Sequence, residues 1–280
     1  MKYLKFRSSQ IIFYSISIFL ILIIVILLAY LLPPAIDWHT TFRPAALELI
    51  SGHSPYNVES YFNPPWALIP LIPIALLPEY LGRGVLVVVT LTAFIYTGHQ
   101  LGAKPLAIFF LVLSPLAIHG ILNGNIDWLV TLGFVLPPPI GLFFVTIKPQ
   151  IGAAVVVFWL VEAWRTGGWL QVVRIIWPIT MVMLISLLIF GLWPLHLNSQ
   201  VGGYWWNGTL WPASIAIGLV LLGRAFQKRR IEYAMGASPC LSPYILLHSW
   251  IGVLFAISRF LPELIAIVIG LWIWVLIRMG

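Results

Sequence analysis

A few charged and amide side chains interrupt an otherwise apolar sequence, and their types suit acid–base and anion-binding chemistry. Asp37 follows the first long apolar run, Asn125 and Asp127 lie in a short polar step near the middle, and Lys148 is a lone cation within a later apolar run. A carboxylate can serve as a base, and a cation can hold an anionic group. Because charge in or near a bilayer is costly, such residues are functional candidates by default.

Each candidate also has a structural interpretation. Asp37 can be a solvated loop carboxylate or the N-cap of a following helix. Asp127 and Lys148 can form a buried ion pair, whereas in a substrate role Lys148 would hold a lipid phosphate. The sequence leaves these alternatives open.

The composition sets the class of protein in which these residues must work. Of 280 residues, 61% are hydrophobic and 8% are charged, which excludes both a soluble globular domain and a disordered chain. Since a membrane span needs about 20 mostly apolar residues, we predict an all-α polytopic membrane protein with nine or ten spans. The net charge of +7 is then a topology signal, and no nucleic-acid partner is expected.

The predicted spans follow the apolar runs. A retained signal anchor is expected at 11–32. The further runs lie at 64–79, 84–99, 105–119, 126–136, 139–163, 172–193, 209–223, 244–258 and 262–278. Ten crossings place both termini in the cytoplasm with most Lys and Arg residues, Arg83 among them, as the positive-inside rule predicts.

Three segments of a single domain, 1–280, are expected to carry the site. The loop 33–63 lies on the outer face and contains an interfacial helix at 40–50, whose apolar residues have helical spacing. The proline-broken region 104–150 is predicted to line a cavity, because irregular backbone at membrane depth must be covered by protein or face water. The aromatic loop 194–208 is also placed outside.

The outer loops hold further candidates. The fork-shaped Arg43 suits a phosphate, although a contact with a lipid headgroup or a pair with Glu48 also explains it. His39 can assist Asp37 or simply be solvated. His196, Trp205 and Trp206 can bind a sugar or an isoprenoid chain, or they can belong to an interfacial aromatic belt.

Several short motifs in the first 160 residues carry a family resemblance. They are Asp37-Trp38, Gly52-x-x-Pro55-Tyr56, Asn63-Pro64-Pro65, Asn123-Gly124-Asn125-Ile126-Asp127 and Lys148-Pro149. The chain resembles GT-C-type integral-membrane glycosyltransferases. It is most similar to the bacterial polyprenol-phosphate-mannose-dependent mannosyltransferases and their uncharacterised relatives.

The resemblance implies a GT-C-like fold and a transferase in the bacterial cytoplasmic membrane. Asp37 would be the catalytic base that deprotonates an acceptor hydroxyl as a mannose-like hexose leaves a polyprenyl phosphate. The partners would be that lipid-linked sugar and the bilayer, with no metal or other cofactor. The substrate-binding residues would be Arg43, His39, Tyr56, Asn125, Asp127, Lys148, His196, Trp205 and Trp206.

The chain also departs from the family pattern. Asn125 stands where the family has Gln, Asp127 stands where it has Asn, and the chain is shorter than most members. Two other functions therefore remain as alternatives. One is a non-catalytic GT-C-like subunit with a protein partner in a membrane complex. The other is a small-solute transporter gated by Asp127 and Lys148.

Overall fold

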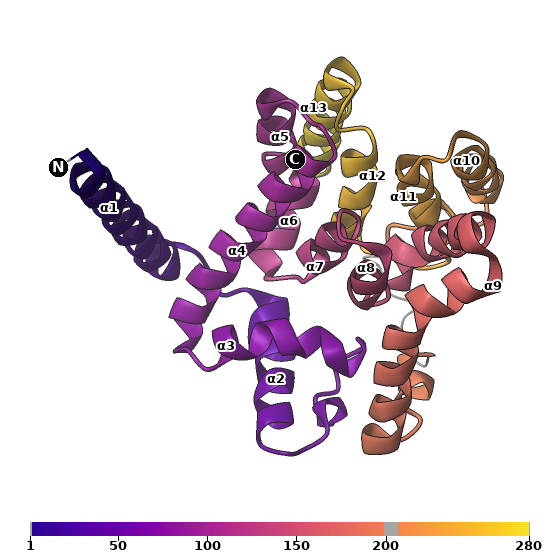
Figure 1. Cartoon of the computed structure of the whole chain (residues 1–280), viewed down its shortest axis with the longest axis horizontal. Coiled ribbons are helices and arrows are strands. Elements are labelled where there is room, and N and C mark those ends of the chain that lie inside the picture. The colour runs from indigo at the N-terminus through magenta and orange to yellow at the C-terminus, as the bar shows by residue number, and fades with distance from the viewer. Residues whose placement is uncertain (1, 199–206, 280) are drawn as a thin grey trace.

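The chain is entirely helical wherever its backbone is described. The computed structural model describes residues 2–198 and 207–279, and within these ranges it contains helices and loops, one isolated bridge between Asn207 and Leu246, and no β-strand. Figure 1 shows short helices gathered around α7 and α8, with α1 projecting from the body. The all-α prediction is confirmed.

The helices follow one another along the chain with few long connections. They are α1 (Lys2–Leu31), η1 (Trp38–Phe42), α2 (Arg43–Ile50), η2 (Pro55–Asn57), η3 (Pro65–Leu71), α3 (Ile72–Ala75), α4 (Glu79–Gln100), α5 (Pro105–Val112), α6 (Pro115–Asn123), α7 (Asp127–Gly133), α8 (Pro138–Val145), α9 (Pro149–Phe190), η4 (Trp193–Asn198), α10 (Ile215–Lys228), α11 (Ile231–Cys240), η6 (Leu247–Trp250), α12 (Ile251–Ala256) and α13 (Leu261–Met279).

The described helices make this a multi-pass membrane protein with fewer long spans than predicted. Four are long and apolar enough to cross a bilayer, namely Tyr14–Leu31, α4, α9 and α13. The pair α5 and α6, bent by 56°, would make a fifth. The predicted nine or ten spans are therefore not borne out. Prolines and glycines divide most of the other apolar runs into helices too short to cross alone.

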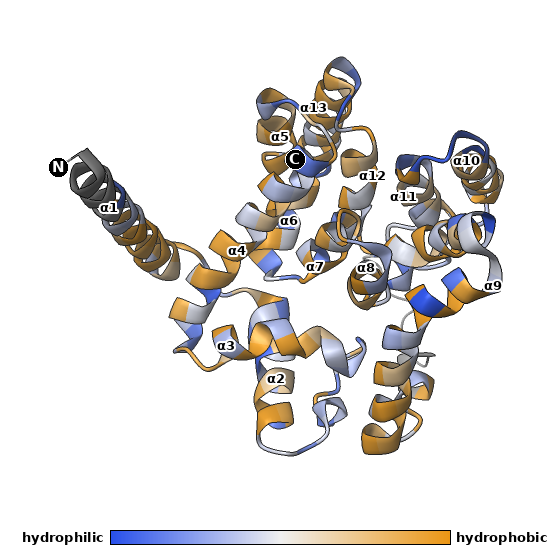
Figure 2. Cartoon of the chain, viewed as in Figure 1, coloured by the Kyte–Doolittle hydropathy of each residue, from blue (hydrophilic) through white to orange (hydrophobic). Residues whose placement is uncertain are grey.

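The predicted run 139–163 is divided, because its first part forms α8 and its second part begins α9. Helix α9 then joins that second part to most of the predicted run 172–193 in one long element. Its backbone is non-helical at Gly167 and Gly168, so the element consists of two arms that meet at a kink. A glycine pair is a common cause of such a break. Figure 2 shows that apolar residues cover most of the second arm, as they do α13 and the coloured part of α1.

The run 64–79 does not form the predicted second span. Prolines divide it into η3 and α3, which have seven and four residues. Glu79 at the start of α4 then lies 2.5 Å from Nδ1 of His39, so the chain has returned to the side of the loop 33–63. Arg83, predicted in a cytoplasmic loop, is instead buried near this end of α4 with 5% of its surface exposed.

The predicted interfacial helix exists as the continuous pair η1 and α2. Its apolar stripe faces the protein over most of its length, since Phe42, Ala45 and Ala46 are at most 3% exposed. Only Ile50, at its end, is largely exposed. The stripe therefore reflects packing against η2, η3 and α3 more than contact with lipid.

The last helix does not return the C-terminus to the side predicted for it. Arg259, just before α13, donates a hydrogen bond to the carbonyl of Leu101 at the far end of α4. Farther along α13, Trp272 Nε1 donates to the carbonyl of Leu113, 3.0 Å away and nearer the Asp37 side. Both α1 and α13 thus run toward that side, and the predicted placement of both termini on one face is not supported (Figure 1).

A close contact joins the first loop to the end of α6. Gly124 has φ of +70° and ends α6, a conformation that favours glycine after a helix. A Cβ placed on Gly124 would lie 2.7 Å from the Cβ of Trp38. The backbone just before Asn125 can therefore approach Trp38 only because Gly124 has no side chain.

We expect Gly124→Ala to lower the thermal midpoint of the purified protein much more than Gly52→Ala. Both glycines have positive φ, so both substitutions introduce backbone strain of about 1–2 kcal/mol. Only Gly124 also meets a neighbour, because nothing lies within 4 Å of a Cβ at Gly52. Equal losses in the same detergent would show that the Trp38 contact is unimportant.

Candidate functional site

The centre of the site is a buried carboxylate that contacts three polar groups. Asp127 Oδ1 lies 2.5 Å from Nζ of Lys148. Its Oδ2 lies 2.6 Å from Nδ1 of His248 and accepts a 2.9 Å hydrogen bond from Oγ of Ser249. All four residues are at most 4% exposed. Full hydrogen bonding and an adjacent cation are what a buried carboxylate needs to remain charged.

Asn125 connects this buried carboxylate to Asp37. Its Oδ1 accepts hydrogen bonds from Lys148 Nζ at 2.5 Å and from the Ile126 amide at 2.7 Å. Its Nδ2 donates to Oδ2 of Asp37 at 2.6 Å. Because an ammonium can only donate and a carboxylate can only accept, the two neighbours determine which way the amide points.

Asp37 is the open end of this chain of contacts. It is partly exposed, whereas Asn125, Asp127 and Lys148 are buried. The Asn125 bond is the one hydrogen bond to its carboxylate among the described residues, and it uses Oδ2. Oδ1 is therefore free to receive a proton from a bound molecule, which is the geometry that a general base requires.

The local sequence explains how these side chains meet. Ser114 caps α6, and Gly124 ends it directly beside Trp38. The chain then forms the helical hairpin of α7 and α8, which begins at Asp127 and ends at Lys148. Lys148 has an extended backbone, and Pro149 follows as the first residue of α9, a position that favours proline. The two ends of the hairpin thus face each other.

A second imidazole lies beside the buried cluster. The rings of His119 and His248 are stacked, with centroids 5.5 Å apart and planes inclined by 28°. Asn123 Nδ2 lies 3.3 Å from the ring nitrogens of His119. His119 is exposed, so the stack runs from the buried carboxylate toward the surface.

Two predicted site residues join a different cluster. His39 Nδ1 lies 2.5 Å from Oε1 of Glu79, and Arg43 Nη1 lies 3.8 Å from Oε2 of the same carboxylate. Arg43 is thus not paired with Glu48, the alternative suggested by the sequence. Glu48 instead contacts His53 and Asn57. Neither His39 nor Arg43 is hydrogen bonded to Asp37.

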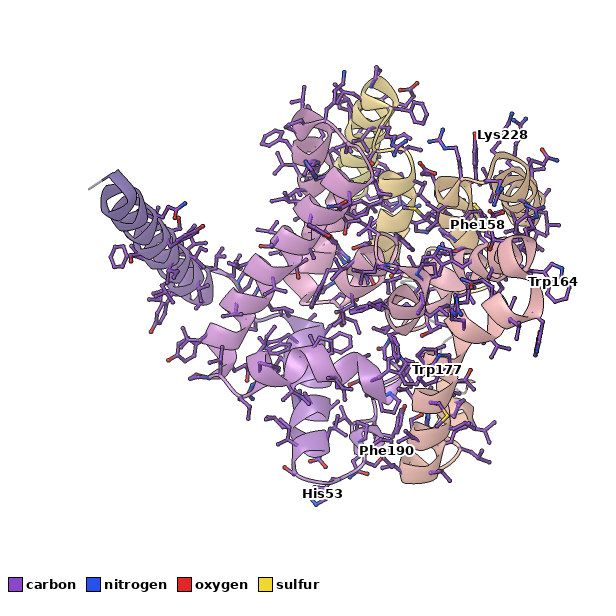
Figure 3. All side chains as sticks on the ribbon, in the orientation of Figure 1. His53, Phe158, Trp164, Trp177, Phe190 and Lys228 are labelled. Carbon is purple, nitrogen blue, oxygen red and sulfur yellow. The ribbon has the colours of Figure 1, made fainter. Side chains whose placement is uncertain are left out.

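Tyr56 belongs to an aromatic cluster that joins the loop 33–63 to η4, just after α9. Its hydroxyl donates to the carbonyl of Asn63 at 3.0 Å, and its ring stacks on Trp193 with centroids 5.8 Å apart. Trp66 meets Trp193 edge-on. Burial raises the pKa of the Tyr56 hydroxyl well above its ordinary value, so this group remains a neutral donor. Figure 3 shows Phe190 and His53 at the same end of the molecule, opposite Lys228.

The remaining predicted contacts cannot be placed. The backbone of His196 lies in η4, but its side chain is outside the described part of the chain, as are Trp205 and Trp206 altogether. Within the described part, no group of three or more His, Cys, Asp or Glu residues has a geometry that could hold a metal ion.

Sequence reasoning missed His248 and Ser249. Both lie in the predicted apolar run 244–258, where an adjacent imidazole and hydroxyl are unexpected. Polar groups at membrane depth need a partner. That rule would have marked the pair as candidates, although nothing in the sequence names Asp127 as the partner.

Removing the cation should destabilise the fold strongly. We expect Lys148→Met to lower the free energy of unfolding by about 3–5 kcal/mol, because it leaves Asp127 without its charged partner in a buried site. Lys104→Met, at an exposed lysine, is the matched control and should change stability by less than about 0.5 kcal/mol. Denaturant titration in detergent measures both. A small effect at Lys148 would mean that the pair is not buried in solution.

Comparison with known proteins identified no relative of the chain. No protein-family model, curated protein or solved structure that was compared with the chain matches it.

Proposed function

We propose that this protein is a membrane glycosyltransferase of the GT-C type, with Asp37 as its catalytic base. The proposed reaction moves a hexose, mannose-like by the resemblance of the motifs, from a polyprenyl phosphate to a lipid or glycan acceptor. The observation that carries the proposal is the half-exposed Asp37 carboxylate, held through one oxygen by the buried amide of Asn125.

The proposed step is an inverting displacement. Asp37 Oδ1 takes the proton of the acceptor hydroxyl as the hydroxyl oxygen bonds to the anomeric carbon of the sugar. The bond from that carbon to the phosphate oxygen breaks, and its electron pair leaves with the polyprenyl phosphate. A carboxylate with a fixed orientation suits this role, because a general base must reach the proton in the transition state.

Lys148 and Asp127 act as positioning residues in this proposal. Lys148 already contacts Asp127 and Asn125 and is 4% exposed, so direct contact with a leaving phosphate is not supported. Its effect reaches Asp37 through the orientation of the Asn125 amide.

Arg43, on the Asp37 side, is the better candidate for the phosphate. Its side chain is 25% exposed, and its Nε has no hydrogen-bond partner among the described residues. A guanidinium with unsatisfied donors is suited to bind a phosphate oxygen.

The second candidate function is transport of a small solute. The observation that favours it is the buried chain of Lys148, Asp127 and His248, because ionisable residues in membrane domains often form proton or ion pathways. In a transporter this chain would control flux, and Asp37 would not be required for bond breaking. A non-catalytic subunit of the same fold would show neither sugar transfer nor solute transport.

Asp37→Asn tests the enzymatic proposal. The substituted amide keeps an oxygen that can accept from Asn125, so the fold should persist, but it cannot take a proton. We expect the transfer rate from a synthetic polyprenyl phosphate sugar to fall at least about 100-fold. The control is Glu48→Gln, at another carboxylate of the outer loop, which should retain the rate.

Mass spectrometry of co-purified lipids gives an independent measurement. A polyprenyl phosphate sugar enriched on the Asp37→Asn protein would support a transferase arrested before transfer. Wild-type transfer activity in this variant would sink the assignment of Asp37. Solute flux with no transfer in either protein would favour the transporter instead.

A further inference from the structure

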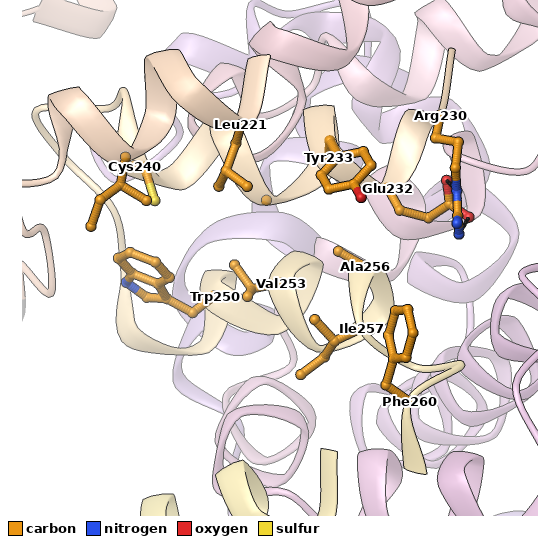
Figure 4. A pocket seen from close by; sticks show the side chains of 12 residues that line it. Leu221, Arg230, Glu232, Tyr233, Cys240, Trp250, Val253, Ala256, Ile257 and Phe260 are labelled. Carbon is orange, nitrogen blue, oxygen red and sulfur yellow. Dashed lines mark hydrogen bonds and ion pairs between the residues drawn. The ribbon is translucent and has the colours of Figure 1, made fainter. Parts of the chain in front are cut away.

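A cavity of about 320 Å³ lies away from the Asp37 site, between α10 and α11 on one side and η6 with α12 on the other (Figure 4). Its walls are mainly apolar side chains. They include Leu221, Tyr233, Cys240, Trp250, Val253 and Ile257. Arg230 and Glu232 lie at one end of the view, and Cys240 with Trp250 at the other. The cavity is thus a long apolar space with a charged end.

The charged end carries an excess of positive groups. Glu232 is already paired with Arg230 at 2.9 Å and with Arg259 at 3.7 Å, and Glu162 with Arg229 at 2.7 Å. Burial opposes ionisation of Glu232, but the hydrogen bond and charge of Arg230 lower its pKa below the ordinary value, so it remains a carboxylate.

Two cations of α10 near this end are left without a carboxylate. Arg224 and Lys228 are exposed, and neither lines the cavity or forms an ion pair with another described residue. They follow Ile217 and Leu221 of the cavity wall at spacings of three and four residues, so all four share one face of α10. Local carboxylates therefore do not neutralise the end of the cavity. The positive charge that remains is available for an anion from outside the protein.

The other end of α10 presents apolar side chains on its exposed surface. Ile217, Leu219 and Val220 are 57–62% exposed, which is costly in water and favourable in the acyl-chain region of a bilayer. Ile217 also lines the cavity, so the cavity borders this outer surface. An occupant can therefore come from the membrane.

The dimensions agree with one membrane component. Ile217 and Lys228 are separated by about 16 Å along α10, at 1.5 Å per residue. That is about half of the 30 Å hydrocarbon core, the depth that one lipid chain occupies below its headgroup. Basic pockets between membrane helices are known binding sites for anionic headgroups.

We propose that this cavity binds an anionic glycerophospholipid of the surrounding leaflet. One acyl chain fills the apolar space between α10, α11 and α12, and the phosphate group contacts Arg224 and Lys228. The site is separate from Asp37, and the proposal does not depend on sugar transfer.

The first test is lipid retention by the full-length protein in detergent, measured by native mass spectrometry. The probes are phosphatidylglycerol and phosphatidylcholine with identical acyl chains. We expect wild-type protein to retain phosphatidylglycerol at least five-fold more than phosphatidylcholine. Replacing both Arg224 and Lys228 by Gln should remove this preference, whereas Lys104→Gln, an exposed lysine that does not line the cavity, should keep it.

A second variant tests the apolar space. Gly236 lines the cavity, and Gly236→Leu should fill part of it and lower retention of both lipids. Gly223→Leu is the matched control, because Gly223 is on α10 but does not line the cavity, and nothing lies within 4 Å of a Cβ there. Circular dichroism checks that both variants remain folded.

Two results would overturn the proposal. One is equal retention of the two lipids by wild-type protein, which would exclude recognition of the anionic headgroup. The other is unchanged retention in the folded Gly236→Leu protein, which would place any bound lipid elsewhere. If Gly236→Leu does not fold, the double substitution of the exposed Arg224 and Lys228 still decides the question.

Discussion

The arrangement of the site depends on keeping the carboxylate of Asp127 charged inside an apolar protein. A buried carboxylate without compensation would cost several kcal/mol. The compensation comes from Lys148, 21 positions later, and from His248 and Ser249, more than 120 positions later. One electrostatic requirement therefore brings three separated segments of the chain to the same place, namely the start of α7, the start of α9 and η6.

The same requirement explains the position of Asp37. The Lys148 ammonium donates hydrogen bonds to both Asp127 and Asn125, so the carbonyl of the Asn125 amide must face that ammonium. The amide nitrogen is then directed at Asp37. A half-exposed carboxylate on the first loop is thereby oriented by a charge that it does not touch. His39 and Arg43 are close to Asp37 in the sequence, but both contact Glu79 instead. Proximity along the chain therefore did not determine which residues belong to the site.

The sequence predicts the class of fold better than the course of the chain through it. Apolar content alone indicates a helical membrane protein, and of the isolated polar residues Asn125 does contact both Asp37 and Lys148. The path is harder to predict, because an apolar run has the same composition whether it crosses the bilayer or turns back. The run 64–79 turns back at its prolines, and this places Arg83 on the side opposite to the one predicted. His248 was missed for a related reason, since its partner is set only by tertiary structure.

The hairpin of α7 and α8 can also be considered as a closed loop. The contact between Lys148 and Asp127 joins its two ends much as a covalent cross-link would, and closing a flexible loop of 21 positions costs on the order of 3 kcal/mol of chain entropy. This entropy is lost in a single step, when both helices form together. Because the contact joins both ends of the hairpin, α7 and α8 become ordered together, and their packing against α4 and α9 holds the closed loop in place.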